Sequence, residues 1–259
     1  MHGAKLIEKI MLSRSEVRQI QQLKQKRTRD ELGMFCVEGM KSVTEGLKAQ
    51  LEPFLCVSTS KEIVSSIEKR FDLQVRLVSN EIMKKCTHFS TPSEVLIVFK
   101  KSAQKALPND QWIVALDEIQ DPGNLGTLMR TLDWFGFRHL LCSPNTVDCF
   151  NPKTVQASMG SYTRVSCLYE ELPIALDRLQ LPIYGADLEG ASLPEMTFDT
   201  KGILVLGNEG HGLSEAVKQR VDHFITIPSA GDAQVESLNA AVSGAIIAYT
   251  ISSRLGFQR

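Results

Sequence analysis

The sequence predicts an α/β protein with two domains, and three observations lead to this prediction. Short apolar runs alternate with amphipathic helical stretches along the chain. A polar segment at residues 100–110 interrupts this alternation and has the composition of a linker. The balance of charge also reverses there, because residues 1–110 hold 19 Lys and Arg against 13 Asp and Glu, whereas residues 111–259 hold 10 against 17. We therefore predict a smaller domain over residues 1–104 and a larger one over residues 105–259.

The basic character of the first domain has two interpretations. A net charge of +6 beside a second part of −7 is typical of a module that binds a polyanion such as nucleic acid, attached to a domain with another task. Alternatively, both charges serve only to keep the two surfaces solvated.

The cysteine, histidine and hydropathy patterns exclude several classes of protein. The six cysteines form no C-x-x-C pair and have no histidine at metal-ligand spacing, so we expect reduced thiols, no disulfide and no metal. No apolar run reaches the ~20 residues of a membrane span, and the charges of Lys5, Glu8 and Lys9 exclude a signal peptide. These patterns predict a cytoplasmic protein without membrane contact. The cysteines are Cys36, Cys56, Cys86, Cys142, Cys149 and Cys167.

The first domain is expected to open with one helix from Ser13 to Arg29. Ser13 and Glu16 have the spacing of a capping box, in which each side chain bonds the backbone of the other residue. Four cations crowd the expected end of this helix, and two explanations stay open: interaction with the helix dipole or contact with phosphate groups. These cations are Lys24, Lys26, Arg27 and Arg29.

The rest of the first domain alternates short strands and helices. It contains no nucleophile–base set and no glycine-rich phosphate loop, which favours binding over chemistry. The expected strands cover residues 34–37, 54–58, 75–78 and 94–99, and the expected helices cover residues 38–47, 61–69 and 81–85.

The second domain begins with a continuously apolar strand, the pattern of a parallel sheet buried on both faces. The alternation that follows predicts an open parallel α/β sheet. Its strands are expected at residues 112–116, 139–142, 164–167, 182–186, 202–206 and 223–227. Its helices are expected after Asn124 and at residues 151–160, 170–179, 214–220 and 236–254.

The first polar stretch of this domain follows the strand that ends at Leu116. Asn124 lies where a helix is expected to begin, so it either caps that helix or serves a site. Gly126 and Arg130 are four residues apart and share one helix face. Because Arg130 is flanked by Leu128 and other apolar residues, its cation needs an internal carboxylate or a bound anion.

The second stretch is the glycine loop G-N-E-G-H-G, which runs from Gly207 to Gly212. It departs from the dinucleotide fingerprint G-x-G-x-x-G and lies far from the first strand, so we do not expect NAD. The tight backbone of the loop aims Glu209, whose alternative role is to cap the following helix.

The third stretch leaves the sheet at Pro228, which cannot continue a strand ladder. Ser237 and Asn239 are expected at the start of the last helix, close to its free amide groups. Small residues share one face of this helix and favour close packing, within the chain or between two copies. They are Ser237, Ala241, Gly244, Ala245 and Ala248.

Together these stretches closely resemble the signatures of the SpoU (TrmH-like) RNA 2′-O-ribose methyltransferases of the SPOUT superfamily. The resemblance covers residues 112–256 and rests on three motifs in order. They are N-x-G-x-x-x-R at Asn124, Gly126 and Arg130; G-x-E-G-x-G-L at Gly207, Glu209, Gly210, Gly212 and Leu213; and I-P-M-x-G…E-S-L-N at Ile227, Pro228, Gly231, Glu236, Ser237, Leu238 and Asn239.

Two departures from the family pattern occur in the third motif, and one further similarity occurs upstream. Ser229 stands where the family usually has Met, and there are two extra residues between Gly231 and Glu236. Residues 35–47 are similar to the start of the family's L30e-like RNA substrate-binding domain, which agrees with the basic charge of this region.

The resemblance implies a knotted fold, a cofactor and an assembly. Family members thread the C-terminal segment through a loop into a trefoil knot, an arrangement that periodicity does not suggest. The knot binds S-adenosylmethionine through backbone contacts, without a metal, and the proteins are homodimers with the active site near the interface. The implied cofactor contacts are Leu206, Gly207, Gly212, Ile227 and Leu238.

The implied reaction is methyl transfer to a ribose 2′-OH, which must lose its proton near the transition state. By resemblance Arg130 is either the base or, given the pKa of arginine above ~12, an electrostatic stabiliser of the developing alkoxide. Asn124, Glu209, Ser237 and Asn239 are expected to position Arg130 and the ribose. The two-domain layout favours ribosomal RNA over transfer RNA as the substrate. An RNA-binding homologue without catalysis remains the alternative from another class, and an oxidoreductase is disfavoured.

Overall fold

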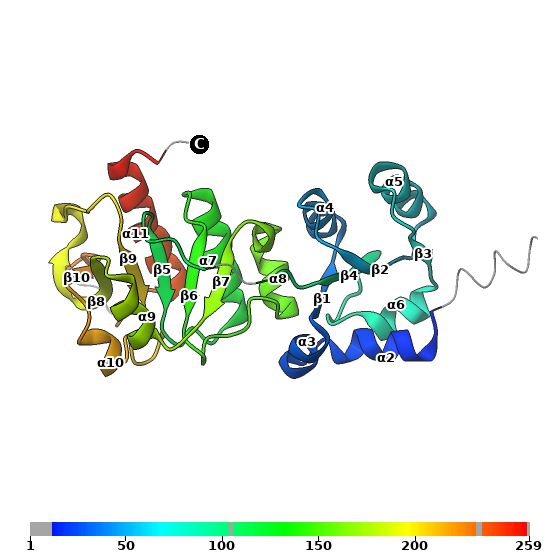
Figure 1. The fold of residues 1–259 in the computed structure, drawn as a ribbon, viewed down its shortest axis with the longest axis horizontal. Helices are drawn as coiled ribbons and strands as arrows, with labels where there is room; N and C mark the ends of the chain where they lie inside the picture. Colours follow the sequence, from blue (N-terminus) through cyan, green and yellow to red (C-terminus); the bar gives the residue numbers. More distant parts are fainter. Residues whose placement is uncertain (1–11, 104–105, 232–234, 258–259) are drawn as a thin grey trace, which may run out of the picture. The chain divides into compact units, whose positions relative to one another are not determined.

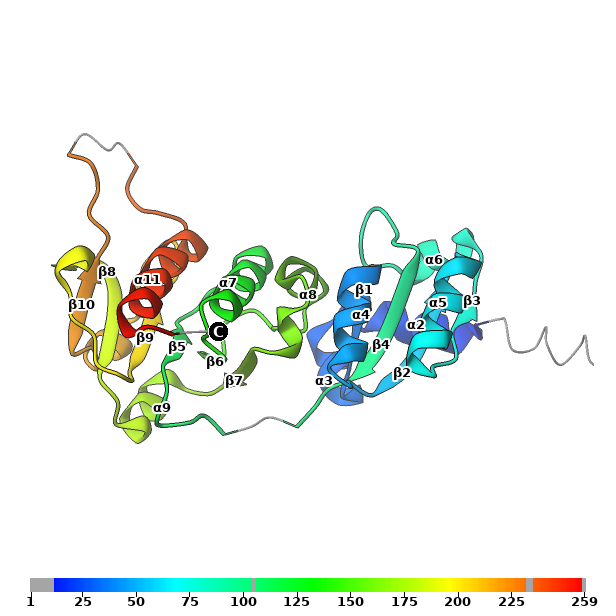
Figure 2. The ribbon, with the colours of Figure 1, turned by 90° about the horizontal axis from the view of Figure 1, so that it is seen from above.

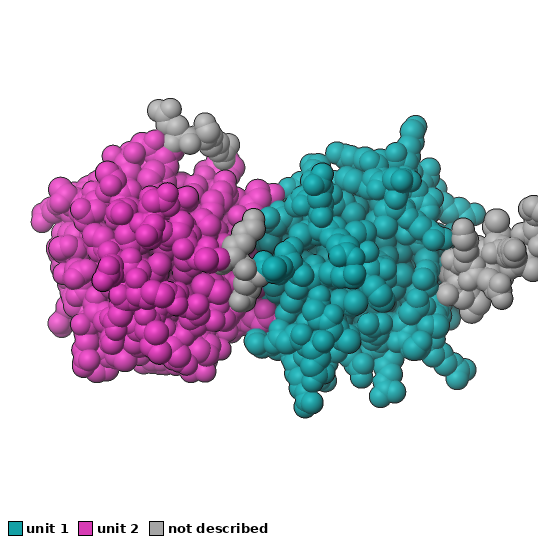
Figure 3. Space-filling model, in the orientation of Figure 1, with its two compact units in different colours: residues 1–103, 150–163 teal, residues 104–149, 164–259 magenta. Residues whose placement is uncertain are grey.

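The computed structural model describes residues 12–103, 106–231 and 235–257. Three parts of the chain discussed above lie outside these ranges. They are the charged N-terminal segment, where no signal peptide is expected, two residues of the linker, and residues 232–234 of the third motif. The described chain divides into two compact units (Figure 3), of which the first comprises residues up to 103 together with residues 150–163. The second unit comprises the remaining residues. The assignment of one unit to RNA binding and the other to catalysis stays a prediction.

The first unit contains a four-stranded sheet in the order β1-β4-β2-β3 (Figure 1). The central strand β4 is antiparallel to β1 and β2, and β3 is parallel to β2. Alternate residues of the strands face opposite layers of helices. The strands are β1 (Met34–Glu38), β2 (Pro53–Ser58), β3 (Arg76–Leu77) and β4 (Val95–Lys100). The helices are α2 (Arg14–Gln22), α3 (Lys26–Leu32), α4 (Met40–Lys48), α5 (Lys61–Phe71), α6 (Asn80–Cys86) and α8 (Pro152–Ser158), with a short 3₁₀ turn η1 (Ser161–Thr163).

The α2–α3 segment corrects the prediction of one continuous helix. The capping box of Ser13 and Glu16 is present as predicted, but the helix ends at Gln22 and a second begins at Lys26. Arg29 folds back, is 1% exposed, and donates from Nη1 to the backbone oxygens of Leu23 and Lys24, at 2.9 Å each. Its cation therefore caps the end of α2, so phosphate contact by this residue was the wrong alternative.

Residues 150–163 belong to the first unit, although two strands of the second unit, β5 and β6, precede them in the sequence. The Tyr162 hydroxyl donates to the backbone oxygen of Ser42 at 2.9 Å. The ring of Phe35 packs against Phe150, with centroids 4.4 Å apart, and edge-on against Tyr162 at 5.8 Å. Aromatic contacts and a buried hydrogen bond thus fix this segment against β1 and α4.

The second unit is a six-stranded, fully parallel sheet in the order β10-β8-β9-β5-β6-β7. This confirms the predicted open parallel sheet. Each strand begins within two residues of its expected start, but β8 ends at Ser192, six residues later than expected. The strands are β5 (Ile113–Leu116), β6 (His139–Cys142), β7 (Ser166–Tyr169), β8 (Ile183–Ser192), β9 (Ile203–Leu206) and β10 (His223–Thr226). The helices are α7 (Pro122–Trp134), α9 (Leu172–Leu179), α10 (Glu215–Lys218) and α11 (Ala240–Leu255), with a 3₁₀ turn η2 (Leu193–Glu195).

Helices cover both faces of this sheet (Figures 1 and 2). One face packs against α9 and α10 through a core that includes Ile113, Val205 and Leu176. On the other face α11 packs against α7, and a Cβ added at Gly244 would lie 2.6 Å from Leu128 and 2.8 Å from Leu206. The small-residue face of the last helix therefore serves close packing within the chain.

The last helix begins later than predicted. It starts at Ala240, and Asn239 is its N-cap, accepting from the amides of Ala241 and Val242 at 2.9 and 3.3 Å. Ser237 lies outside the helix.

None of the described helices is long and apolar enough to cross a membrane. All six cysteines lie in the described ranges, and all six are free.

Replacing the buried arginine of α3 tests its structural role. Arg29→Ala leaves two carbonyl oxygens without their donor and opens a void, so we expect a loss of about 2–3 kcal/mol of stability. Arg27→Ala is the matched control, because Arg27 is exposed and Glu31 is its one ion-pair partner among the described residues. This variant should lose less than about 0.5 kcal/mol of stability. Urea unfolding of the full chain measures both. Equal midpoints for the two variants would contradict the capping role of Arg29.

Candidate active site

The candidate site lies at the carboxyl edge of the second sheet, where the strand order reverses. From β5 the chain proceeds to β6 and β7 on one side, then crosses to β8, β9 and β10 on the other. The loops that follow β5 and its neighbour β9 therefore diverge at one point of the edge. Such a switch point is where open parallel sheets bind ligands.

The glycine loop after β9 is closed by its own backbone. Asn208 and Gly212 exchange two backbone hydrogen bonds of 3.0 and 2.9 Å. A Cβ added at Gly207 would lie 2.4 Å from the backbone carbon of Gly212, so only glycine permits this closure. Gly212 itself has a φ of +70°, in the left-handed region that favours glycine.

A hydrogen-bond chain joins three of the five predicted catalytic residues. The Asn124 amide donates to Glu209 Oε1 at 2.5 Å, and the Asn239 amide donates to Asn124 Oδ1 at 3.1 Å. These side chains come from α7, from the loop after β9 and from the start of α11. The site thus unites three segments that are distant in sequence.

This geometry corrects two alternatives for the polar residues. Asn124 is not a cap, because Asp121 is the N-cap of α7. The Asp121 carboxylate accepts from the backbone amide of Asn124 at 2.8 Å. Glu209 does not cap the helix that follows it, because Ser214 is the N-cap of α10. Both side chains are therefore available for the hydrogen-bond chain.

The other two predicted catalytic residues, Arg130 and Ser237, do not join this chain. Both are exposed, and neither forms a hydrogen bond or an ion pair with another described residue. The expectation that Arg130 lies among apolar side chains is wrong, because Leu128 and Met129 point into the core while Arg130 points outward. Arg130 instead shares an exposed stripe of α7 with Thr127 and Trp134.

The predicted cofactor residues gather around the same loops. Leu206 is the buried last residue of β9, and Gly207 follows it. Ile227 comes directly after β10, and Leu238 precedes the cap of α11 with 44% of its surface exposed. The backbone amide and oxygen of Gly212 are both engaged by Asn208, so this residue shapes the loop rather than offering free backbone groups.

Two acidic residues that the sequence did not single out support the site. The buried Asp117 accepts from the Ser214 amide at 2.7 Å, which ties the end of β5 to the glycine loop. Glu118 has a φ of +58°, unusual for a side-chain-bearing residue, and its backbone oxygen accepts from Asn208 Nδ2 at 2.8 Å. No pattern in the chain predicts this conformation.

The Glu118 carboxylate also holds the glycine loop. It accepts from Asn145 Nδ2 at 2.8 Å and lies 3.3 Å from His211 Nε2. The Asn145 amide and the His211 ring keep the pKa of Glu118 below its ordinary value. An ionised Glu118 therefore bridges the loops that follow β5, β6 and β9.

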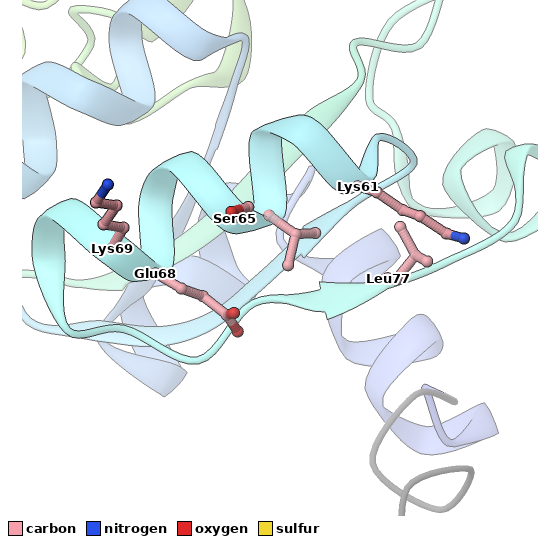
Figure 4. A pocket seen from close by; sticks show the side chains of 6 residues that line it. Lys61, Ser65, Glu68, Lys69 and Leu77 are labelled. Carbon is pink, nitrogen blue, oxygen red and sulfur yellow. The ribbon is translucent and has the colours of Figure 1, made fainter.

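A separate surface hollow of about 350 Å³ lies between α5 and β3 of the first unit. Figure 4 shows Lys61 and Lys69 near opposite ends of α5, with Ser65, Glu68 and Leu77 between them. It contains none of the predicted site residues. Two lysines on an exposed helix suit contact with a polyanion rather than chemistry.

Comparison with known proteins agrees with this arrangement. Residues 111–249 match the SpoU rRNA Methylase family, and residues 14–96 match the MRM3-like substrate binding domain. A relative in Bacillus subtilis (strain 168), the 23S rRNA (guanosine(2553)-2′-O)-methyltransferase RlmP, is 31% identical over 239 residues, covering 90% of this chain and 94% of the relative.

Two solved structures are similar along almost the whole chain. A putative RNA methyltransferase of the TrmH family from Porphyromonas gingivalis has a TM-score of 0.85 at 34% identity and covers 94% of this chain and 99% of its own. An AdoMet-bound rRNA methyltransferase from Sinorhizobium meliloti has a TM-score of 0.81 at 27% identity. The match covers 95% of this chain and 97% of that protein's chain.

The parallel sheet, the loop cluster at its switch point and these matches define an RNA methyltransferase. The chain belongs to the SpoU rRNA methylase family. The family resemblance inferred from the three motifs is thereby confirmed.

A single added methyl group in the glycine loop tests its closure. Gly207→Ala forces Cβ into the Gly212 backbone. We therefore expect the free energy of unfolding to fall by about 1–3 kcal/mol and S-adenosylmethionine to bind at least tenfold more weakly. Gly210→Ala is the control, because its Cβ would meet only Asn208 Oδ1 at 3.3 Å. Calorimetric titration measures the affinities. Binding by Gly207→Ala as tight as by Gly210→Ala would show that the closure is dispensable.

Proposed function

We propose that this protein transfers a methyl group from S-adenosylmethionine to a ribose 2′-OH of ribosomal RNA. The observation that carries the proposal is the hydrogen-bond chain from Glu209 through Asn124 to Asn239 at the switch point of the sheet. Membership of the SpoU rRNA methylase family supports the same reaction. The named activity of the Bacillus relative supports ribosomal RNA as the substrate.

The residues around the loops after β9 and β10 fit the proposed cofactor. Leu238 is 44% exposed and Val235 is 72% exposed, so the segment before α11 offers apolar side chains to an adenine or a methionine chain. Leu206, Gly207 and Ile227 would contribute backbone and apolar contacts. The AdoMet-bound relative from Sinorhizobium meliloti supports this assignment.

The proposed chemistry needs a positioned hydroxyl and a group that stabilises negative charge. When bound, S-adenosylmethionine supplies a methyl group on a cationic sulfur, so the transfer itself needs no metal. Asn124, Glu209 and Asn239 orient the ribose through their connected polar groups. Arg130 stabilises the developing alkoxide, and the proton leaves to water or a phosphate, because a guanidinium is a poor base.

We propose further that the site is completed by a second copy of the chain. Arg130 is exposed and lies beside Trp134, which is 67% exposed on the same stripe of α7. On α11, which packs against α7, Val242 is 47% and Tyr249 is 59% exposed, and a spacing of seven places them on one face. Such an apolar surface around a cation that has no ion-pair partner among the described residues suits a homodimer interface.

The family's trefoil knot is also part of the proposal. After the edge strand β10, residues 227–239 lead to α11, which packs against α7. The glycine at position 244 lets α11 contact both Leu128 of α7 and Leu206 of β9. This tight placement supports a threaded C-terminal segment.

The first unit is proposed to bind the RNA. Its match to a substrate-binding domain and its excess of Lys and Arg over Asp and Glu support this role. The proposed location is the cytoplasm. Transfer RNA is the second candidate substrate, and an RNA-binding protein without catalysis is the candidate from another class.

A methyl-transfer assay tests the function. Labelled S-adenosylmethionine is offered with total ribosomal RNA and total transfer RNA from a strain that lacks this protein, and the 2′-O-methyl site is mapped. We expect label in ribosomal RNA. Label only in transfer RNA would overturn the substrate, and no label with no binding of S-adenosylmethionine would overturn the enzyme.

Substitution of Arg130 tests its place in the reaction. Arg130→Ala should lower kcat by about 10²–10³, as removal of an oxyanion-stabilising donor does, while S-adenosylmethionine still binds. Arg130→Lys should retain part of the rate, because it keeps the charge without the planar fork. Arg178→Ala is the control, since Arg178 is exposed and its one ion-pair partner in the described part of the chain is Glu170. Full activity of a dimeric Arg130→Ala variant would exclude a catalytic role.

A further inference from the structure

Three potential metal ligands that are separate in sequence meet inside the first unit. Cys36 and Glu38 are two residues apart on β1 and share one face of the strand. His88 follows the end of α6. One ligand atom from each residue lies within 4.8 Å of the others, and Cys36 and Glu38 are 2% and 3% exposed. Chain spacing does not indicate this group, and we had expected no metal ligands.

One hydrogen bond decides which ring nitrogen of His88 carries the proton. His88 Nε2 lies 2.8 Å from the backbone oxygen of Ile20. Because a carbonyl oxygen can only accept, Nε2 carries the proton and Nδ1 carries the lone pair. Nδ1 is buried and has no hydrogen-bond partner among the described residues. Buried polar atoms without partners are rare in folded proteins. The free lone pair of Nδ1 therefore indicates a ligand that binds there.

The carboxylate is held in one orientation by its neighbours. Glu38 Oε1 accepts from the His88 backbone amide at 2.8 Å, and Oε2 accepts from the Thr87 hydroxyl at 2.7 Å. The Ser93 backbone amide is a further donor to this carboxylate, so three of its four lone pairs are engaged and one is left for an ion. Donors that fix a ligating carboxylate, and a carbonyl that fixes the tautomer of a ligating histidine, are typical of metal sites.

We propose that Cys36 Sγ, Glu38 and His88 Nδ1 bind one Zn²⁺ ion in the first unit. The S–H bond of Cys36 breaks as the Zn–S bond forms, and its proton is released to water. The thiolate and carboxylate together balance the two positive charges of the ion. A neutral complex is what a buried site requires. Sulfur and nitrogen ligands favour zinc over magnesium or calcium.

The three protein ligands leave the fourth position of the zinc tetrahedron to a water molecule. The ion then joins β1 to the end of α6, so its role is structural and separate from methyl transfer.

The test uses the full chain stripped of metal and titrated with Co²⁺ alone. Cobalt bound to a thiolate gives a sulfur-to-metal charge-transfer band, which reports the ligand directly. We expect the band to saturate at one ion per chain and to disappear when Zn²⁺ is added. Cys36→Ser should abolish the band, and His88→Ala should weaken cobalt binding at least tenfold. Cys56→Ser is the matched control, because Cys56 is an equally buried thiol of the same sheet, and it should keep the band.

Three results would overturn the proposal. They are a titration of the wild-type chain without a thiolate band, a band that persists in Cys36→Ser, and a band that is lost equally in Cys56→Ser. If Cys36→Ser does not fold, His88→Gln and equilibrium dialysis of Zn²⁺ replace it, with unchanged stoichiometric binding as the overturning result. None of these readouts depends on methylation, so they are independent of the proposed function.

Discussion

The side-chain amide of Asn124 connects the segments on which the candidate site depends. It donates to Glu209 and accepts from Asn239, so one residue on α7 links the loop after β9 to the start of α11. An amide suits this position because it offers a donor and an acceptor at once. The carboxylate of Asp121 holds the backbone of Asn124, and Asn239 in turn caps α11. The arrangement of the site and the start of the last helix are therefore fixed together.

A second set of contacts holds the glycine loop against the sheet. Asp117 and Glu118 follow β5 directly, and they bind the backbone or side chains of Ser214, Asn208 and His211. Because β5 and β9 are parallel neighbours, the two loops leave the sheet at the same level. The left-handed backbone of Glu118 turns its carbonyl oxygen toward Asn208, whose side chain donates to it. This strained conformation therefore helps to hold the glycine loop in place.

Much of the fold could be predicted from the sequence, because strands buried on both faces are continuous apolar runs and helices show a period near 3.6. The sequence did not indicate which polar residues touch. Arg29 looked like one of four surface cations, but it is buried because the helix breaks before it. Arg130 looked enclosed because its sequence neighbours are apolar, although those neighbours lie on the opposite side of α7. The motifs indicated the site residues, whereas their hydrogen bonds depend on contacts more than 80 positions apart along the chain.

Residues 150–163 belong to the first unit although residues on both sides of them build the second. The polypeptide therefore passes between the units three times, near residues 103, 149 and 163. A protein joined in this way is not a simple tandem fusion. Separating its halves at the apparent linker would deprive β1 of the aromatic partners Phe150 and Tyr162. Recombination that exchanges only the N-terminal part must also preserve this returning segment, which restricts how freely the two units can evolve as interchangeable modules.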